Sequence, residues 1–173
     1  NILIMRFYKK KTPNVDELGI AEIISINNDC VRVILLEYDN KDAIITFNNL
    51  TGRRLDIIKR YIKVGRNYPL LVIRTDNNYI DLSNKHINSN NENMAKDKFK
   101  KYTLVMKIFN IFCNNLWKNK YQNKEIDPTF LEETAEKTIW KFDSRHCYDK
   151  INSIKIDSSI LNEFDLNYNE KKL

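Results

Sequence analysis

Residues 17–38 read ELGIAEIISINNDCVRVILLEY, and this stretch decides the fold of the first half of the chain. Its two runs, 17–26 and 30–38, are rich in β-branched residues and partly alternate, as strands with one buried face do. Between them, Asn-Asn-Asp at 27–29 tolerates positive φ and bonds its own backbone, which suits a tight turn. The stretch therefore predicts a β-hairpin.

Three more short strands are predicted after the hairpin, because apolar and β-branched residues again cluster between polar turns. They are AIITF at 43–47, LLVIR at 70–74 and YIDLS at 79–83. A long connection separates the third strand from the fourth. Five short strands with this irregular spacing fit a small Greek-key barrel of the OB type, and a plain antiparallel sandwich is the alternative.

The apolar period changes from two to 3.6 after the Asn-rich segment 85–93, so helices are expected beyond it. A helix of roughly 25 residues is predicted from residue 94 onward, because apolar side chains recur there at steps of three and four. These side chains are Phe99, Tyr102, Met106, Phe109, Phe112 and Leu116. Asp127 and Pro128 are the cap and first residue expected of a second helix, which runs on to Phe142.

Shorter helices are predicted near residues 149–155 and 157–164, the latter again with an Asp cap. A last helix is expected after Asn167 or Asn169, and the chain stops in its first turn. Because helices this short do not stand alone, we expect the natural protein to continue beyond Leu173.

We therefore predict an α+β chain of two domains, a β-barrel domain of residues 1–88 and a compact α-helical domain of residues 89–173. With 42% hydrophobic and 30% charged residues, the 173-residue chain has enough apolar material for one core or two small ones. No apolar run approaches the roughly 18 residues of a membrane-spanning helix.

Residues that commonly carry catalysis or bind metals show no suggestive spacing. Cys30, Cys113 and Cys147 form no CxxC pair, and we expect free thiols in a reducing compartment. His86 and His146 have no ligand cluster around them, so no metal site is predicted. The three glycines are too far apart for a phosphate-binding loop. A binding module is therefore favoured over an enzyme, with no cofactor of its own.

Positive charge concentrates in residues 50–67, LTGRRLDIIKRYIKVGRN. This basic stretch holds six cations and one acid, a local charge of +5 where the whole chain has +6. The cations are Arg53, Arg54, Lys59, Arg60, Lys63 and Arg66. Such a field suits a nucleic acid backbone, and a solvated basic loop is the alternative. Apolar residues including Ile62 and Val64 resemble the buried side of a short helix, so part of the stretch is expected to be scaffold.

Short motifs along the chain resemble the alpha subunit of eukaryotic translation initiation factor 2. The strongest are LTGRR at 50–54 and IKVGRN at 62–67, where the family has LSRRR and IRIGRN. Weaker matches occur elsewhere, in the same order along this chain as in the family. They are RFY at 6–8, LLEYDN at 35–40, VIR at 72–74, YIDLS at 79–83, DKF at 97–99, TIW at 138–140 and SIL at 159–161. The resemblance covers essentially the whole chain.

The resemblance implies an S1-type OB barrel followed by a compact helical domain. It also implies a third, α/β domain that binds the gamma subunit and is absent here. The family's factor joins the beta and gamma subunits, with GTP bound by gamma, and helps deliver initiator methionyl-tRNA to the small ribosomal subunit in the cytoplasm. The alpha subunit is then not the enzyme. Its basic loop, residues 51–66, is expected to face mRNA, tRNA and rRNA, above all through Arg53 and Arg54.

The family carries a regulatory serine in this loop. Alpha-subunit kinases phosphorylate it, and the factor then traps its guanine nucleotide exchange factor. The matching position is Thr51, while Tyr79 and Asp81 match the segment against which those kinases dock. This chain departs from the family in having Thr for Ser, Gly52 and Asp56 for two arginines, and two residues fewer before Tyr79.

These departures keep two alternatives open. One is a viral-type mimic that acts as a pseudosubstrate inhibitor of the alpha-subunit kinase, which the absent serine favours and the helical domain disfavours. The other is a generic S1-type RNA-binding module without a role in initiation.

Overall fold

The computed structural model describes residues 6–50, 62–76, 79–85, 87–121, 125–142 and 144–172. The chain forms two compact units, and residues 4–99 make up the first. Helix α2 (Ser89–Tyr121) begins next to residue 88, where we predicted the domain boundary, and the first unit continues to Phe99 within that helix.

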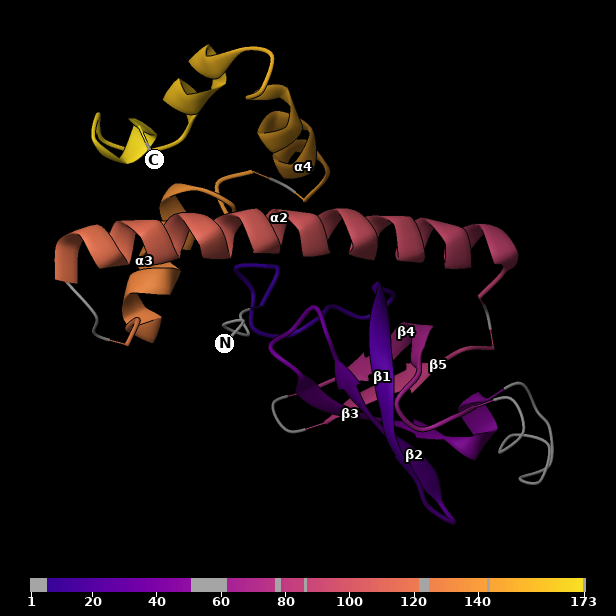
Figure 1. The fold of residues 1–173 in the computed structure, drawn as a ribbon. Helices are drawn as coiled ribbons and strands as arrows, with labels where there is room; N and C mark the ends of the chain where they lie inside the picture. Colours follow the sequence, from indigo (N-terminus) through magenta and orange to yellow (C-terminus); the bar gives the residue numbers. More distant parts are fainter. Residues whose placement is uncertain are drawn as a thin grey trace. The chain divides into compact units, whose positions relative to one another are not determined.

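The first unit contains a closed barrel of five strands, β1 (Leu18–Ile26), β2 (Cys30–Leu35), β3 (Lys41–Thr46), β4 (Asn67–Thr75) and β5 (Ile80–Ser83) (Figure 1). The strands follow the order β1-β2-β3-β5-β4, and β4 closes the barrel by pairing with β1. Neighbouring strands are antiparallel except β3 and β5, which are parallel. The predicted OB-type barrel is therefore confirmed, and the sandwich is excluded because the sheet is closed.

The predicted hairpin forms the first two strands. Its turn is closed by the Asn27 N–H, which donates to the Cys30 carbonyl at 3.0 Å. The following turn, between β2 and β3, holds Asp39 at φ 56° and Asn40 at φ 54°. Asp and Asn adopt this left-handed conformation more readily than other non-glycine residues, which explains the polar sequence of the turn.

Inward-facing side chains from every strand fill the barrel. They are Ala21, Ile23, Val31, Val33, Leu35, Ala43, Ile45, Leu70, Val72, Ile80 and Leu82. Each large aliphatic side chain buried in this way contributes about 1.5–3 kcal/mol relative to an exposed one. The alternation in the sequence thus sets which face of each strand lies in the core.

Helix α2 is longer than predicted, at 33 residues. It starts earlier because Asn88 caps it: its side-chain carbonyl accepts from the Asn91 N–H at 2.8 Å. Helix α3 (Pro128–Lys137) has the predicted cap, Asp127, which accepts from the Thr129 N–H. It ends before Phe142, contrary to our prediction, because Thr138 leaves the helical conformation at φ −126°.

The rest of the chain forms α4 (Ser144–Ser153) and two 3-10 helices, η2 (Ser158–Glu163) and η3 (Glu170–Lys172). A further 3-10 helix, η1 (Phe47–Asn49), follows β3. Our predicted helix at 149–155 thus begins earlier, and that at 157–164 is a 3-10 helix whose cap is Asp157.

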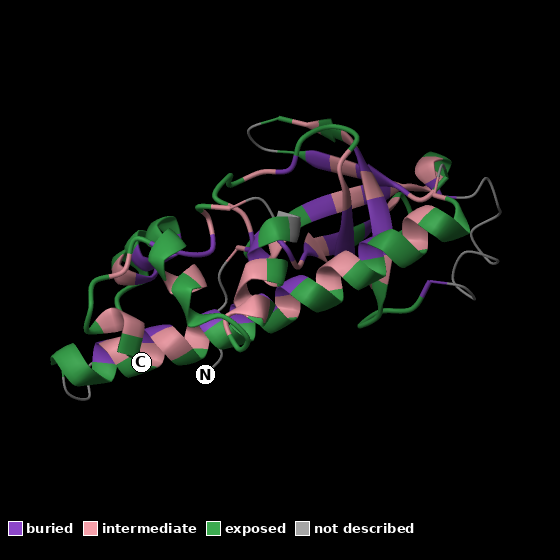
Figure 2. Cartoon of the chain, turned by 90° about the horizontal axis from the view of Figure 1, so that it is seen from above, coloured by how far each residue is buried: buried purple, intermediate pink, exposed green. Residues whose placement is uncertain are grey.

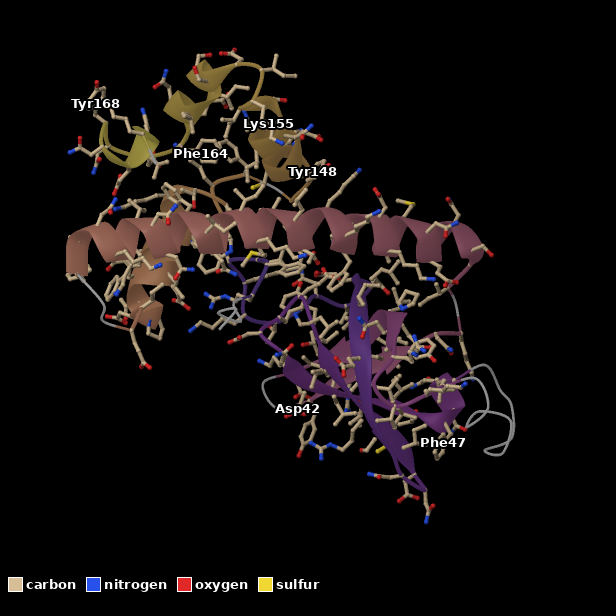
Figure 3. All side chains as sticks on the ribbon, viewed as in Figure 1. Asp42, Phe47, Tyr148, Lys155, Phe164 and Tyr168 are labelled. Carbon is tan, nitrogen blue, oxygen red and sulfur yellow. The ribbon has the colours of Figure 1, made fainter. Side chains whose placement is uncertain are left out.

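Aromatic contacts hold the second unit together. The predicted apolar face of α2 is buried or half-buried, as the colours along the helix show (Figure 2). Trp117 of that helix packs against Phe130 of α3, with ring centroids 5.0 Å apart. Phe164, between η2 and η3 (Figure 3), packs edge-on against Phe142 with centroids 5.2 Å apart. The aromatic stripe is therefore core, as its helical spacing indicated.

Candidate nucleic-acid interface

The basic stretch leaves the barrel core and returns to it. Leu50 at its start is 1% exposed and Ile62 near its end is 7% exposed, and both belong to the barrel's hydrophobic core. The Leu50 N–H donates to the Phe47 carbonyl at 3.2 Å, and the Ser83 hydroxyl donates to the Asn49 carbonyl at 3.0 Å. Both ends of the stretch are thus built into the barrel, as is typical of functional loops on a rigid scaffold.

Several predicted site residues lie outside the described residues. These are Thr51, Arg53, Arg54, Lys59 and Arg60, together with Gly52 and Asp56. Their roles stay predictions.

The described end of the stretch is a tight turn from Lys63 to Arg66. The Arg66 N–H donates to the Lys63 carbonyl at 3.2 Å, and Gly65 has φ 76°, a conformation that favours glycine. Two hydrogen bonds tie the turn to β1: the Gly65 N–H donates to the Ile23 carbonyl at 2.8 Å, and the Ile23 N–H donates to the Arg66 carbonyl at 3.1 Å. The first strand therefore sets the path of the backbone here.

Lys63 and Arg66 are exposed in this turn, and neither forms an ion pair with another described residue. Their charges therefore face solvent. Ile62 is buried, as we predicted, but the same prediction was wrong for Val64, which is 59% exposed. Val64 lies in the turn rather than on the inner face of a helix.

Tyr79 and Asp81 have different surroundings. Tyr79 is 60% exposed, and its backbone N–H is held by the Asp76 carboxylate at 2.8 Å. The Asp81 side chain is 17% exposed and pairs with Arg74, with Nε and Oδ2 2.9 Å apart. A partner can therefore reach the Tyr79 ring directly, whereas Asp81 is already engaged within the sheet. Whether a kinase docks here stays a prediction.

The outer face of β2 and β3 does not carry the stacking surface that many OB folds offer to unpaired bases. Its half-buried or exposed side chains are Cys30, Arg32, Ile34, Asp42, Ile44 and Thr46. None of these is aromatic, and Arg32 pairs with Asp42 (labelled in Figure 3) at 3.4 Å. This face of β2 and β3 therefore offers no aromatic side chain on which a base could stack.

Cysteines Cys113 and Cys147 are fully buried free thiols, and burial raises the pKa of each to about 12. Cys30 is a half-exposed free thiol. The described part of the chain holds no group of three or more His, Cys, Asp or Glu side chains suited to a metal ion. Among the helices described, none combines the length and apolar character needed to cross a bilayer.

Known proteins similar to this chain are translation initiation factors. It is 28% identical to eukaryotic translation initiation factor 2 subunit 1 of Dictyostelium discoideum over 172 residues, 97% of this chain and 49% of that protein. It is 32% identical to the same subunit of Plasmodium falciparum over 143 residues, 82% of this chain and 40% of that protein. The chain belongs to the family of alpha subunits of translation initiation factor 2. It spans about half the length of the curated relatives it matches.

Solved structures of alpha-type proteins share the fold. The a/eIF2alpha chain in a complex with aDim2p and rRNA from Pyrococcus horikoshii superposes with a TM-score of 0.69 at 17% identity, over 93% of this chain and 92% of that one. The intact alpha subunit of aIF2 from Pyrococcus abyssi gives 0.67 at 19% identity, over 90% of this chain and 57% of that one. No family model matches the chain.

Proposed function

We propose that the chain works in translation initiation as the barrel and helical part of an initiation factor 2 alpha subunit. The observation that carries this proposal is a similarity to such subunits along 97% of the chain. The barrel and the helices after it support the proposal, because relatives with this arrangement include an alpha subunit. The role is one of binding in the cytoplasm rather than catalysis. GTP is held by the gamma subunit.

The basic stretch contacts RNA in this role. Arg53 and Arg54 are the foremost contacts, and Lys59, Arg60, Lys63 and Arg66 add to the field around the mRNA, the initiator tRNA and the small ribosomal subunit. The exposure of Lys63 and Arg66 supports the proposal, since neither charge is neutralised by a described acid. The Pyrococcus horikoshii relative was solved together with rRNA.

Binding of the chain to purified small ribosomal subunits, measured over a range of salt concentrations, tests this interface. Replacing Arg53 and Arg54 with alanine should weaken binding and lower the slope of log K against log salt by about 0.7 for each lost contact to single-stranded RNA. The matched control replaces Lys118 and Lys120, exposed lysines at the end of α2, which removes the same charge. Equal losses from both pairs would indicate a non-specific charge effect and refute the assignment.

The proposed partners include the beta and gamma subunits, the latter through an additional domain, and the guanine nucleotide exchange factor. A natural version that carries that domain should bring the beta and gamma subunits with it from a native lysate. An alpha-type protein that recovers neither would not serve as this subunit.

Thr51 is the proposed site of regulatory phosphorylation, and Tyr79 the accessible part of the proposed kinase-docking segment. A phosphate would add about −1.5 to −2 charges to the basic stretch and reorganise it. An alpha-subunit kinase should modify Thr51 more slowly than a Thr51→Ser variant. The second candidate, a pseudosubstrate mimic, is favoured by Thr51 alone; it predicts that the unmodified chain inhibits the kinase on a serine-bearing substrate.

A further inference from the structure

Six ionisable side chains gather where the segment 6–17 and the first turns of α2 meet the barrel. They are Tyr8, Lys10, Glu17, Glu37, Tyr38 and Lys98, and we refer to them as the Glu37 cluster. All six belong to the compact unit of residues 4–99. The cluster lies outside the basic stretch, and the proposed RNA contacts make no use of it.

Glu37 is the buried centre of the cluster, with a side chain only 3% exposed. Its Oε1 accepts from the Ile20 N–H at 3.0 Å, and its Oε2 accepts from the Tyr8 hydroxyl. Lys98 Nζ lies 3.8 Å from Oε2, so it supplies a counter-charge rather than a hydrogen bond. Burial raises the pKa of Glu37, although Lys98, Tyr8 and Ile20 act to lower it.

Glu17 is the second carboxyl group of the cluster. Its carboxylate accepts from the Tyr38 hydroxyl and from the Asn14 N–H at 3.1 Å, and it pairs with Lys10. Burial opposes ionisation of Glu17, but the contacts with Lys10, Tyr38 and Asn14 hold its pKa below the usual range. Lys98 thus lies opposite Glu37 and Lys10 opposite Glu17, so each carboxyl group of the cluster has one lysine beside it.

The cluster joins three parts of the chain. The Phe7 N–H donates to the Glu37 backbone carbonyl at 2.9 Å, which fixes the segment 6–17 on the barrel. The Phe7 ring stacks on Phe99 of α2 with centroids 5.7 Å apart, and Lys98 Nζ lies 5.0 Å from the centroid of the Tyr8 ring. Segment 6–17 therefore contacts the barrel and the first turns of α2 together, so the three parts are coupled.

We propose that the Glu37 cluster is a conformational latch whose release point is Lys98. With the Lys98 charge present, segment 6–17 and residues 89–99 stay on the barrel. Without it they open from the barrel more often, while the barrel itself remains closed.

The physical basis is the asymmetry between losing one charge and losing both. Removing Lys98 leaves Glu37 buried without its counter-charge, which costs far more than removing both partners. Lys98 is 31% exposed, so water already solvates part of it and the latch can open at this side chain. The strands do not depend on Lys98, because their ladder bonds and inward-facing side chains hold the barrel closed.

Amide hydrogen exchange on the whole chain, followed by NMR, tests the latch with the variant Lys98→Met. The reporters are the amides of Phe7 and of residues 96–99, and the internal control is the amides of β2. We expect about tenfold lower protection at the reporters and unchanged protection in β2. The matched variant is Lys96→Met, because Lys96 pairs at 2.5 Å with Glu92 of the same helix and should leave the reporters unchanged.

Two further variants separate charge from packing. Lys98→Arg keeps the charge and should keep the protection. The double variant Glu37→Gln with Lys98→Met removes both charges, so it should recover most of the protection lost in Lys98→Met.

In the Lys98→Met variant, lowering the pH should also return segment 6–17 and residues 89–99 to the barrel. The titratable groups around Glu37 are Tyr8, Lys10, Glu17, Tyr38 and Lys98. In the variant the pKa of Glu37 rises further while that of Glu17 stays lowered, so acid neutralises Glu37 before it neutralises Glu17. Amide shifts of residues 96–99 should then move back toward those of the unmodified chain.

Three results would overturn the proposal. Undiminished protection in Lys98→Met would mean that no latch depends on this charge. Equal loss in β2 would make Lys98 a general stabiliser of the unit. A double variant no better protected than Lys98→Met would show that the contact acts by packing alone.

Discussion

Replacing Gly65 with alanine should destabilise the attachment of the basic stretch by about 1–2 kcal/mol, through backbone conformation alone. The φ of 76° is a left-handed conformation that costs an L-residue about 1–2 kcal/mol. Nothing in the described part of the chain lies within 4 Å of where a Cβ atom would stand, so crowding by these residues adds no cost. A turn that relaxed to negative φ would instead lose the 2.8 Å hydrogen bond to the Ile23 carbonyl, worth about 0.5–1.5 kcal/mol. Either route gives a similar penalty.

The assay is amide exchange at Ile23, because its N–H donates to the Arg66 carbonyl and reports whether the turn is in place. Protection there should fall by a factor of roughly 5 to 30, the equivalent of 1–2 kcal/mol. Tryptophan fluorescence would not report the change, since Trp117 and Trp140 lie in the second unit.

Asparagine at position 65 provides the control, because it adopts left-handed conformations more readily than alanine does. Gly65→Asn should lose clearly less protection at Ile23 than Gly65→Ala. Equal losses would show that the size of the side chain, rather than φ, sets the cost. An unaffected Gly65→Ala variant would show that the turn is not constrained by β1.

Other parts of the molecule give three further predictions. Asp127→Ala removes the cap bond to the Thr129 N–H and should cost about 1 kcal/mol, measured by urea unfolding followed through tryptophan fluorescence. The pKa of Glu17 is lowered in the fold, so its contribution to stability is present above the unfolded-state pKa of about 4.5 and is lost as pH falls through the folded-state pKa. Glu17→Gln should therefore flatten the fall of the unfolding free energy at acid pH. In the native protein at about pH 8, a thiol reagent should modify Cys30 and spare Cys113, whose pKa is raised by burial; rapid modification of Cys113 would contradict its burial.

The strands of the barrel were predictable because their signal is local. Alternation in residues 17–38 and the Asn-Asn-Asp turn at 27–29 define a hairpin without reference to the rest of the chain. The closure of the barrel is not local: it depends on the pairing of β1 with β4 and on the parallel pairing of β3 with β5, which joins Ile44 to Asp81. For this reason strand count alone left the sandwich open.

The end of α3 and the Glu37 cluster were missed for related reasons. Ile139 and Phe142 continue the apolar spacing of α3, but the helix ends before them because Thr138 leaves the helical conformation. Apolar spacing carries no information about this change of backbone conformation. Glu37 belongs to the run LLEY, and no residue spacing around it indicates that it is buried and paired. Its partners Tyr8 and Lys98 lie far from it in the sequence. A charged residue within an apolar run was the available signal, since it must be paired if it is buried.

The barrel unit uses its charges in two ways that salt should separate. The Lys63 and Arg66 side chains face solvent without an ion pair to a described acid, so added salt screens them within a Debye length of about 8–10 Å and should weaken RNA binding. The Glu37 carboxylate is 3% exposed and takes its hydrogen bonds from Tyr8 and Ile20, so mobile ions screen it much less. Raising salt from about 50 to 200 mM should therefore lower affinity for RNA while amide protection at Phe7 stays constant. A parallel fall in both would mean that binding and the latch depend on the same charges, and the division of the unit into an RNA-facing stretch and a separate buried cluster would fail.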